Sequence, residues 1–541
     1  MDRLYRLLTS LGLLVASTFA VFAFLKIKPS ALAAAYHHEL RADEPFYLQY
    51  FTWLFRVLHG DLGWSTSDAQ PVSQGIIERL PATLELALVT LLAAITLGAL
   101  VGFVRARAHA PARELLAGLQ LLFRALPVLP LAMLLQLAAV FSPWPPPAGI
   151  SSVEGFDLRD RFNHLILPVA SMAVPFGAWA SLIFYDVIRV SDSASRVPLR
   201  CLAATGALTA ALIGPPLLAA CVMIEPMFAW PGIARLFYSG VAQADFGLTA
   251  GFLLTYVICI VLVKLCSEFA LGIGDWRLAQ QTGARPTPSS RPRRFSATGI
   301  VACFVLGVAA LGAASANLIA PVGPYLIDQV HWSGYPLAPG VAGHPLGTDE
   351  NGRDLLARLL VGMGTSLGIA VVATIVATAI GAVVAKATMA VTWFDDRGAL
   401  STAGIRPFAA LPFMLTTVVV VFATRHVTSI MNPLGIALII AAVSWPAIVP
   451  AFRALSLATL GSVVGLTGCA LLLEVTLSDL GFGVQPPRAS LGNMFANAQS
   501  NMTMAPWIVL VPSVVVVALL FALYAIADEL HDFPTLPTET E

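Results

Sequence analysis

Charged residues are scarce in this sequence. Aspartate, glutamate, lysine and arginine make up 11% of the 541 residues, whereas soluble domains carry about 25%. Hydrophobic residues make up 57%. This composition excludes a water-soluble fold and indicates a polytopic membrane protein whose backbone polar groups are satisfied inside helices. The formal net charge is zero, so nothing in the sequence points to a nucleic-acid partner.

Motifs that carry chemistry are also missing. The six cysteines lie in or beside apolar runs and show neither metal-ligand spacing nor the pattern of a disulfide framework. The sequence has no Walker phosphate-binding loop, catalytic triad or metal motif. It also lacks the chain of buried His, Asp and Glu that proton-driven carriers use. We therefore expect no catalytic residue, no metal site and no cofactor in this chain, and we expect any ATPase to be a separate protein.

Long apolar runs are what the sequence has in abundance. They fall at 7–26, 82–104, 114–141, 164–188, 200–224 and 246–273, and again at 296–320, 366–390, 406–424, 433–452, 460–477 and 505–528. A helix needs about 20 residues to cross the hydrocarbon core. The sequence therefore predicts an all-α polytopic membrane protein with about twelve transmembrane helices, arranged as two parallel halves of six.

Lysine and arginine are distributed unevenly between the connections. Arg3 and Arg6 precede the first run, and clusters such as Arg105, Arg107 and Arg113 fall in every second connection. The positive-inside rule then places both termini in the cytoplasm. The alternate segments are periplasmic: 28–80, 142–163, 225–245, 321–365, 425–432 and 478–504.

The segment 275–295 divides the chain into two similar halves. It is rich in proline, serine and arginine and lacks hydrophobic periodicity, which is typical of a flexible linker. The first half, 1–274, and the second half, 296–541, each predict one helix, a long periplasmic segment (28–80 or 321–365) and five further helices. Parallel repeats of this kind commonly enclose a translocation path.

The second half contains one conspicuous polar motif before an apolar run. His344-Pro345-Leu346-Gly347-Thr348-Asp349-Glu350-Asn351-Gly352-Arg353-Asp354 reads H-P-L-G-T-D-x-x-G-R-D. This stretch resembles the second permease subunit of the dipeptide/oligopeptide/nickel class of ABC importers. The residues that carry the resemblance are His344, Gly347, Thr348, Asp349, Gly352, Arg353 and Asp354.

The first half resembles the first permease subunit of the same class. Asp61 and Gly63 lie in its Gly60–Ser65 motif, and Glu225 opens the stretch Glu225–Leu236. The resemblance implies a fusion of two subunits with the fold of a type I ABC importer permease in a bacterial inner membrane. It further implies a peptide-like or nickel-chelate-type solute, a periplasmic solute-binding protein, and ATPase subunits that carry ATP and Mg.

Four residues are candidates for the translocation path or its outer gate. Glu225 and Glu474 occupy equivalent places, each at the outer end of the fifth helix of its half, and the turn that contains Trp230 follows Glu225. The alternative is that both carboxylates only anchor loop geometry. Trp230 is interpreted as an interface-belt aromatic. Arg124, inside the third run, has three possible roles: it faces a pore, pairs with a carboxylate or extends to the cytoplasm.

The resemblance fails in the cytoplasmic loops that dock permeases of this class onto their ATPase. No Glu-Ala-Ala pattern follows Arg189 or Arg453, and the connections there are short. The basic residues left as candidate ATPase contacts are Arg189, Arg196, Arg200 and Arg453. An alternative function is therefore a permease-like protein without a motor, acting as a passive channel or as a receptor or scaffold.

Overall fold

The computed structural model describes most of the chain in several ranges. These are residues 45–142, 148–149, 157–190, 199–243, 245–273, 296–319, 323–331, 334–392, 432–453, 457–496 and 498–531, with isolated positions between 12 and 23. The predicted helix at 406–424 and the linker at 275–295 lie outside the described residues, and the predicted helix at 7–26 is described only at isolated positions.

Helices dominate the described ranges, in which pairing between extended segments is limited to isolated bridges. Seven helices there are long and apolar enough to cross a membrane, and one bent helix pair and two shorter apolar helices add to them. Each predicted run other than 7–26 and 406–424 has a helical counterpart. The prediction of an all-α polytopic membrane protein is confirmed.

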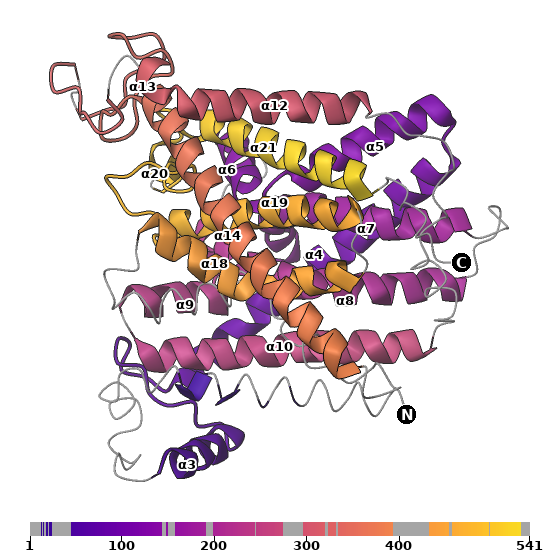
Figure 1. Cartoon of the computed structure of the whole chain (residues 1–541). Helices are drawn as coiled ribbons and strands as arrows, with labels where there is room; N and C mark the ends of the chain where they lie inside the picture. Colours follow the sequence, from indigo (N-terminus) through magenta and orange to yellow (C-terminus); the bar gives the residue numbers. More distant parts are fainter. Residues whose placement is uncertain are drawn as a thin grey trace. The chain divides into compact units, whose positions relative to one another are not determined.

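The chain divides into two compact units, and unit 1 comprises 1–106, 142–283 and 410–412. Its helices are α3 (Phe46–Leu58), α4 (Val72–Arg107), α7 (Leu158–Val190), α8 (Leu199–Met227), α9 (Ile233–Ala242) and α10 (Phe246–Ile273). Helix α8 packs against α7, α9 and α10, and Figure 1 shows α8 and α10 running alongside one another.

Close approach of α4 and α7 in unit 1 depends on glycine. A Cβ atom on Gly98 would lie 2.5 Å from the Cβ of Ala180, and one on Gly102 would lie 2.8 Å from the Cβ of Phe184. Small residues let transmembrane backbones approach closely, and this gain in packing replaces the hydrophobic driving force that is missing in lipid. Ala94, Ala173 and Ala180 continue the buried contact beside these glycines.

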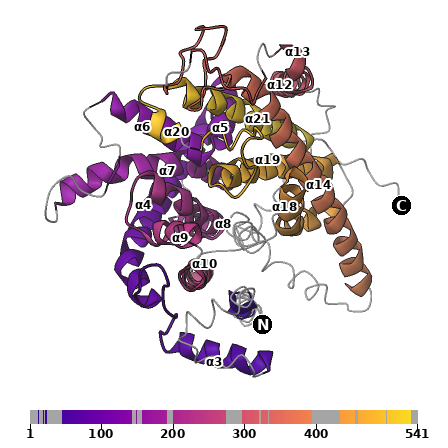
Figure 2. The same ribbon diagram turned by 90° about the vertical axis from the view of Figure 1, so that its left-hand side faces the viewer.

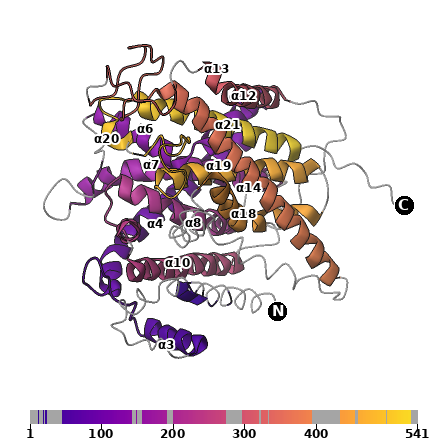
Figure 3. The same ribbon diagram turned by 60° about the vertical axis from the view of Figure 1, so that its left-hand side comes forward.

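Unit 2 comprises 107–141, 284–409 and 413–541. Its helices are α5 (Ala110–Ala125), α6 (Val128–Val140), α12 (Ala297–Ala314), α13 (Ala316–Ile319), α14 (Leu355–Thr392), α18 (Pro433–Ile448), η2 (Val449–Arg453), α19 (Leu457–Asp479), α20 (Ala498–Asn501) and α21 (Trp507–His531). Helix α14 packs on α18 and α19, and α21 packs on α19 and α12. The pairing of α12 with α21 can be followed in Figures 2 and 3.

Two helices of unit 2 come from the first half of the sequence. Helices α5 and α6 are bent by 93° with respect to each other. The break falls at Leu126 and Pro127, where Leu126 is extended and Pro127 precedes the first turn of α6. A proline restricts the residue before it to extended conformations, which explains why α5 ends there. Both helices pack against α21.

Candidate functional site

Glu225 lies in the last turn of α8 and is fully buried. Its carboxylate accepts hydrogen bonds from the Thr83 hydroxyl of α4 at 2.6 Å, from the backbone N–H of Ala234 at 2.7 Å and from that of Arg235 at 3.2 Å. The last two donors belong to the first turn of α9, where the helix dipole favours a negative charge. Glu225 therefore joins the end of α8 to α4 and to the beginning of α9.

The turn between α8 and α9 is folded around this carboxylate. Ala229 has a positive φ of 53°, and a Cβ on Gly232 would collide with the Glu225 carboxylate. Trp230 is fully buried, and its indole N–H donates to the carbonyl of Ala82 at 2.9 Å. The interpretation of Trp230 as a belt aromatic is wrong, because its ring fills the space under the turn and does not face an interface.

Glu474 lies near the end of α19 in unit 2 and is also fully buried. The Ser478 hydroxyl donates to its carboxylate at 2.7 Å, and the hydroxyls of Ser366 and Ser490 lie against the same carboxylate. Ser366, in α14, also accepts the backbone N–H of Leu491 at 3.0 Å. Glu474 thus joins the end of α19 to α14 and to the segment that follows α19.

The same three-part arrangement therefore occurs once in each unit. We call Glu225, Thr83 and the N–H of Ile233 the first bracket, because Thr83 also accepts that N–H at 2.9 Å. Glu474, Ser366 and the N–H of Leu491 form the second bracket. In both, a hydroxyl from the second predicted span of a half connects a carboxylate on the fifth span to the segment beyond it.

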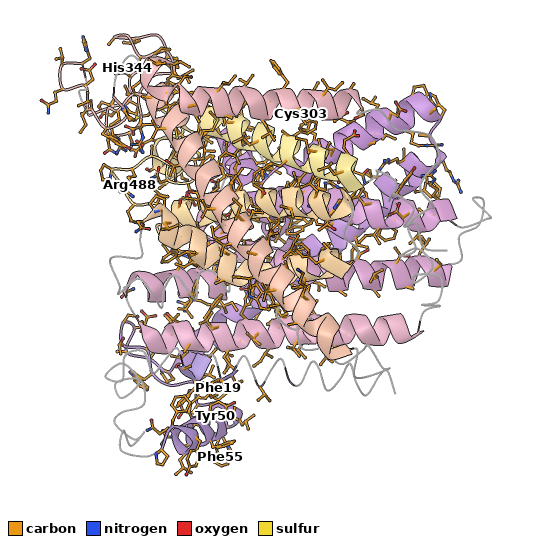
Figure 4. The ribbon with its side chains drawn as sticks, in the orientation of Figure 1. Phe19, Tyr50, Phe55, Cys303, His344 and Arg488 are labelled. Atoms are coloured by element: carbon orange, nitrogen blue, oxygen red, sulfur yellow. The ribbon has the colours of Figure 1, made fainter. Side chains whose placement is uncertain are left out.

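Residues 480–496 form a folded segment on the second bracket. The Asn493 side chain donates to the carbonyl oxygens of Arg488 at 2.6 Å and Val484 at 3.2 Å, and Figure 4 marks the position of Arg488. A Cβ on Gly492 would lie 2.8 Å from the Cα of Val475 and closer still to the Val475 carbonyl oxygen. Only glycine fits where this segment returns onto α19.

The polar motif of the second half forms a compact cap in front of α14. Leu355 donates its backbone N–H to the carbonyl of Gly347 at 3.0 Å, and Asp354 accepts the N–H of Ala357 at 3.2 Å. Gly347 has a φ of +78°, and a Cβ there would lie 2.5 Å from the carbonyl oxygen of Leu337. The motif residues therefore mainly bond to one another and to the start of the helix.

Asp349 is the charged centre of this cap. Its carboxylate contacts the guanidinium of Arg353 at 2.7 Å and that of Arg358 at 3.1 Å, and it accepts the backbone N–H groups of Asn351 and Arg353 at 2.9 Å each. Gly352, at φ +76°, closes the turn between them. Burial, followed by the neighbouring Asp349, raises the pKa of Glu350.

His344 bridges two carboxylates in the cap. Its Nδ1 lies 3.2 Å from Asp354 and its Nε2 lies 3.3 Å from Asp328. Asp328 also lies 2.8 Å from the Nδ1 of His331. The hydrogen bond to the His331 side chain is the largest cause that lowers the pKa of Asp328 to about 2. Figure 4 shows His344 within this cap.

In each unit, hydrogen bonds also connect the start of the last predicted span to the segment that precedes the second predicted span. In unit 1, Asp245 precedes α10 and accepts the Ser65 hydroxyl at 2.7 Å and the backbone N–H of Ser67 at 2.9 Å. In unit 2, the indole N–H of Trp507 donates to the carbonyl of Thr348 at 3.2 Å. Burial opposes ionisation of Asp245, but its hydrogen bonds outweigh burial and lower its pKa.

Asp61 and Gly63, the motif pair of the first half, form a local turn. The carboxylate of Asp61 accepts the backbone N–H of Gly63 at 3.0 Å and lies 3.8 Å from the Arg56 guanidinium. Gly63 has a φ of +89°. Its carbonyl accepts the N–H of Val72, the first residue of α4, at 3.0 Å. The motif thus positions the start of a transmembrane helix, as the polar motif of the second half does.

Arg124 forms a salt bridge with Asp528 of α21. The arginine side chain is buried and the aspartate is half-exposed. The arginine lies over the ring of Tyr524 at 5.7 Å from its centroid. Of the three roles that the sequence allowed for Arg124, the structure shows pairing with a carboxylate.

The candidate ATPase contacts are less completely described. Arg189 is exposed at the end of α7, whereas Arg196 lies outside the described residues. Arg200 is in the first turn of α8 and Arg453 ends η2, but their side chains are not described. The connections are short: α7 ends at Val190 and α8 begins at Leu199, and only 454–456 separate η2 from α19. Within the described part of the chain, no group of His, Cys, Asp and Glu is placed to hold a metal ion.

Three partners of these groups were not identified as functional from the sequence. Thr83 and Ser366 each lie at the start of a predicted apolar run, 82–104 and 366–390, and the sequence assigns neither a role. Asp328 lies outside the polar motif, well before His344 in the sequence. A buried hydroxyl inside an apolar run is a usable signal, because a polar group in lipid needs a partner.

Comparison with known proteins gives relatives of one kind. No protein-family model matches the chain. A putative peptide permease protein of Brucella ovis is 26% identical over 313 residues, which cover 51% of this chain and 98% of that protein. The oligopeptide transport system permease protein AppB of Bacillus subtilis is 26% identical over 44% of this chain and 81% of its own length. The permease protein OppC of Mycobacterium bovis is 27% identical over 40% of this chain and 84% of its own length. The homologues are thus peptide permeases, which are transport subunits.

Proposed function

We propose that this chain is the membrane permease of an ABC importer for peptides. It combines both permease halves, 1–274 and 296–541, through the linker 275–295. The observation that carries the proposal is the pair of matching brackets. Each unit has one, and each is formed by the second and fifth predicted spans of its half. Alternating access needs each half to move largely as a rigid body, and each bracket connects the second and fifth spans of its half to the segment that follows the fifth.

The comparisons support the fusion through their coverage. The Brucella ovis permease aligns over almost its whole length, yet it uses only 51% of this chain. This chain is therefore long enough to hold two such subunits. AppB and OppC are named as permease proteins of oligopeptide transport systems, and a peptide is accordingly the solute class that we propose.

The orientation follows from the distribution of basic residues. The two brackets and the cap in front of α14 lie at the periplasmic end of an inner-membrane protein, where a solute-binding protein delivers the peptide. The ATPase subunits, with ATP and Mg, bind at the opposite end, where Arg189, Arg196, Arg200 and Arg453 are the basic residues nearest to the short connections.

The decisive experiment is purification of the tagged chain from its native membrane, followed by reconstitution. Proteins that co-purify are identified, and uptake of a labelled oligopeptide is measured in proteoliposomes with and without ATP and the binding protein. The proposal expects ATPase subunits in the preparation and accumulation that requires ATP. The charge reversals Arg189→Glu and Arg453→Glu should reduce recovery of the ATPase, and Arg107→Glu provides a control in another predicted cytoplasmic connection.

The opposite outcome is equally informative. A preparation that contains no ATPase and lets the peptide equilibrate without ATP would replace the importer by a passive channel, the alternative that the short cytoplasmic connections favour. Binding of the solute-binding protein without any peptide flux would instead leave a receptor or scaffold.

A further inference from the structure

Helix α3 carries an apolar stripe on the side that is not packed against the protein. Tyr47, Phe51, Phe55 and Leu58 are spaced by four, four and three residues and therefore lie on one face of the helix. Their exposed fractions are 61%, 61%, 63% and 76%. Among the described residues, no packing covers the four large apolar side chains of this stripe.

The opposite face of α3 packs against other residues of unit 1. Tyr50 and Trp53 are buried and lie against Phe22, with ring centroids at 5.6 and 5.5 Å. The hydroxyl of Tyr50 is 2.9 Å from that of Thr18. Thr18 and Phe22 belong to the first apolar run of the chain, so α3 is attached to a predicted membrane span. Figure 4 shows Phe55 on the side of α3 that faces away from Phe19.

The length of α3 excludes a transmembrane role. Thirteen residues extend about 20 Å at 1.5 Å per residue, whereas the hydrocarbon core is about 30 Å thick. The helix begins after Pro45 and ends at Leu58, and Gly60, two residues later, has a φ of +83°. A helix of this length with an apolar exposed face, joined to a span, fits along the interface of a bilayer.

Charge on α3 points to the same location. Arg56 is its only charged residue, and that side chain is mostly covered and lies 3.8 Å from the carboxylate of Asp61. The exposed stripe therefore carries no charge. A surface that binds a soluble partner typically has a polar rim, whereas tyrosine and other large aromatic and aliphatic side chains are typical of helices that lie in the membrane interface.

We propose that α3 lies in the headgroup and acyl boundary of one bilayer leaflet, with Tyr47, Phe51, Phe55 and Leu58 inserted into the lipid. The helix anchors the beginning of unit 1 through the rings of Tyr50 and Trp53. It thereby fixes the depth at which the Asp61–Gly63 turn presents the start of α4. This lipid contact does not depend on which solute the protein transports.

Site-directed spin labelling of the full chain in lipid nanodiscs tests the proposal. Single cysteines are placed at successive positions from Tyr47 to Leu58 in a background without the six native cysteines, after the background has been shown to be monodisperse. Collisions with oxygen, which partitions into lipid, are compared with collisions with a water-soluble nickel chelate. Leu88→Cys, exposed on α4, serves as the lipid reference, and Gln70→Cys, in an exposed turn, serves as the aqueous reference.

The ratio of oxygen to nickel accessibility should follow the helical period along α3. At Phe51→Cys and Phe55→Cys it should shift to the value found at Leu88→Cys, and Gln70→Cys should stay low. A stripe that reads like Gln70→Cys in nanodiscs overturns the proposal. If that stripe then becomes shielded only when the solute-binding protein is added, the surface is a protein-docking site. Shielding from both reagents in nanodiscs without any partner would indicate contact with a second copy of the chain and would also overturn it.

Discussion

The two brackets place a buried carboxylate at corresponding points of the two units, but they hold it by different donors. Glu225 is bound by two backbone N–H groups at the start of α9, together with one hydroxyl. Glu474 is surrounded by serine hydroxyls, and a long folded segment stands where unit 1 has a helix. Backbone N–H groups can only donate, whereas a hydroxyl can donate or accept. The first bracket therefore requires acceptor oxygens at this position more strictly than the second.

The folded segments over the two brackets should respond most strongly to an added methyl group. A Cβ on Gly492 meets backbone atoms of Val475, which cannot move without displacing α19, whereas a Cβ on Gly232 meets the Glu225 side chain. We expect Gly492→Ala to destabilise by about 3 kcal/mol or more and Gly232→Ala by about 1–3 kcal/mol, the usual range for overpacking. Thermal unfolding of both variants in one detergent measures this order.

Gly307→Ala is the matched control, because a Cβ there meets nothing within 4 Å. It should unfold close to the unchanged protein. Equal destabilisation by Gly492→Ala and Gly232→Ala would show that the two segments are equally adaptable, and the contrast between backbone and side-chain obstruction would then be lost.

Replacing each carboxyl group by an amide addresses the difference between the brackets directly. Glu225→Gln leaves one acceptor oxygen where the α9 N–H groups and the Thr83 hydroxyl have two, and should cost about 1–2 kcal/mol. Glu474→Gln should cost about 0–1 kcal/mol, because the hydroxyls of its serine neighbours can reorient to accept from an amide. The measurement is again the unfolding midpoint at neutral pH.

Thr83→Val and Ser366→Ala complete that comparison from the hydroxyl side. Each removes the partner of a backbone N–H, that of Ile233 or Leu491, and each should be more costly than Glu474→Gln. If Glu474→Gln destabilised as much as Glu225→Gln, the serine hydroxyls would not be adaptable and the two brackets would be electrostatically alike.

The sequence predicts the helices well and the brackets poorly, for a physical reason. Apolar runs determine where helices cross a membrane, so α4, α7, α8, α14 and α21 follow from hydropathy alone. The pairing of Glu225 with Thr83 joins residues 142 positions apart, and no periodicity encodes such a contact. Trp230 shows this limit of sequence-based prediction. Tryptophan is a residue type that suits a membrane interface, but the turn at Ala229 places this side chain in the protein interior.

Local motifs occupy an intermediate position. The glycines of the polar motif predict turns with positive φ, and Gly347 and Gly352 have them. The sequence could not predict that Asp328, sixteen positions before His344, would supply the second carboxylate for its ring. It also left three roles for Arg124, since the choice depends on where Asp528 comes to lie.

The hydrogen bonds of Asp245 and Trp507 at the start of the last predicted span also differ between the units. Asp245→Asn removes an anion that accepts hydrogen bonds from Ser65 and Ser67 and should cost about 1–3 kcal/mol at neutral pH, whereas Trp507→Phe removes one neutral hydrogen bond and should cost about 1 kcal/mol. Because folding lowers the pKa of Asp245, its stabilisation is present above about pH 4 and is lost as the pH falls through the lowered value.

Unfolding midpoints between pH 7 and pH 3 distinguish the hydrogen bonds of Asp245 from that of Trp507. The deficit of Asp245→Asn should shrink as the pH falls below about 4, and the deficit of Trp507→Phe should stay constant. If the stability lost in Asp245→Asn did not change with pH, ionisation of the native Asp245 carboxyl would not contribute to stability. The distinction between an ionic contact at Asp245 and a neutral one at Trp507 would then fail.

The smallest effect is expected at Asp328, in the cap of the second half. Its pKa is lowered to about 2, first by the hydrogen bond to the His331 side chain. A lowered pKa stabilises the folded cap above about pH 4, and this contribution disappears as the pH falls to about 2. Asp328→Asn should therefore loosen the cap slightly at pH 7 and have no effect near pH 2. Hydrogen exchange of the 323–331 segment, measured after brief exposure to each pH, reports the change locally.

His331→Gln is the matched variant. It removes the largest cause of the lowered pKa but keeps the Asp328 carboxyl. It should therefore move the acid transition of the cap to a higher pH without abolishing it. Unchanged exchange in both variants would show that the contact between Asp328 and His331 does not order the 323–331 segment, and that the cap depends on the ion pairs of Asp349 instead.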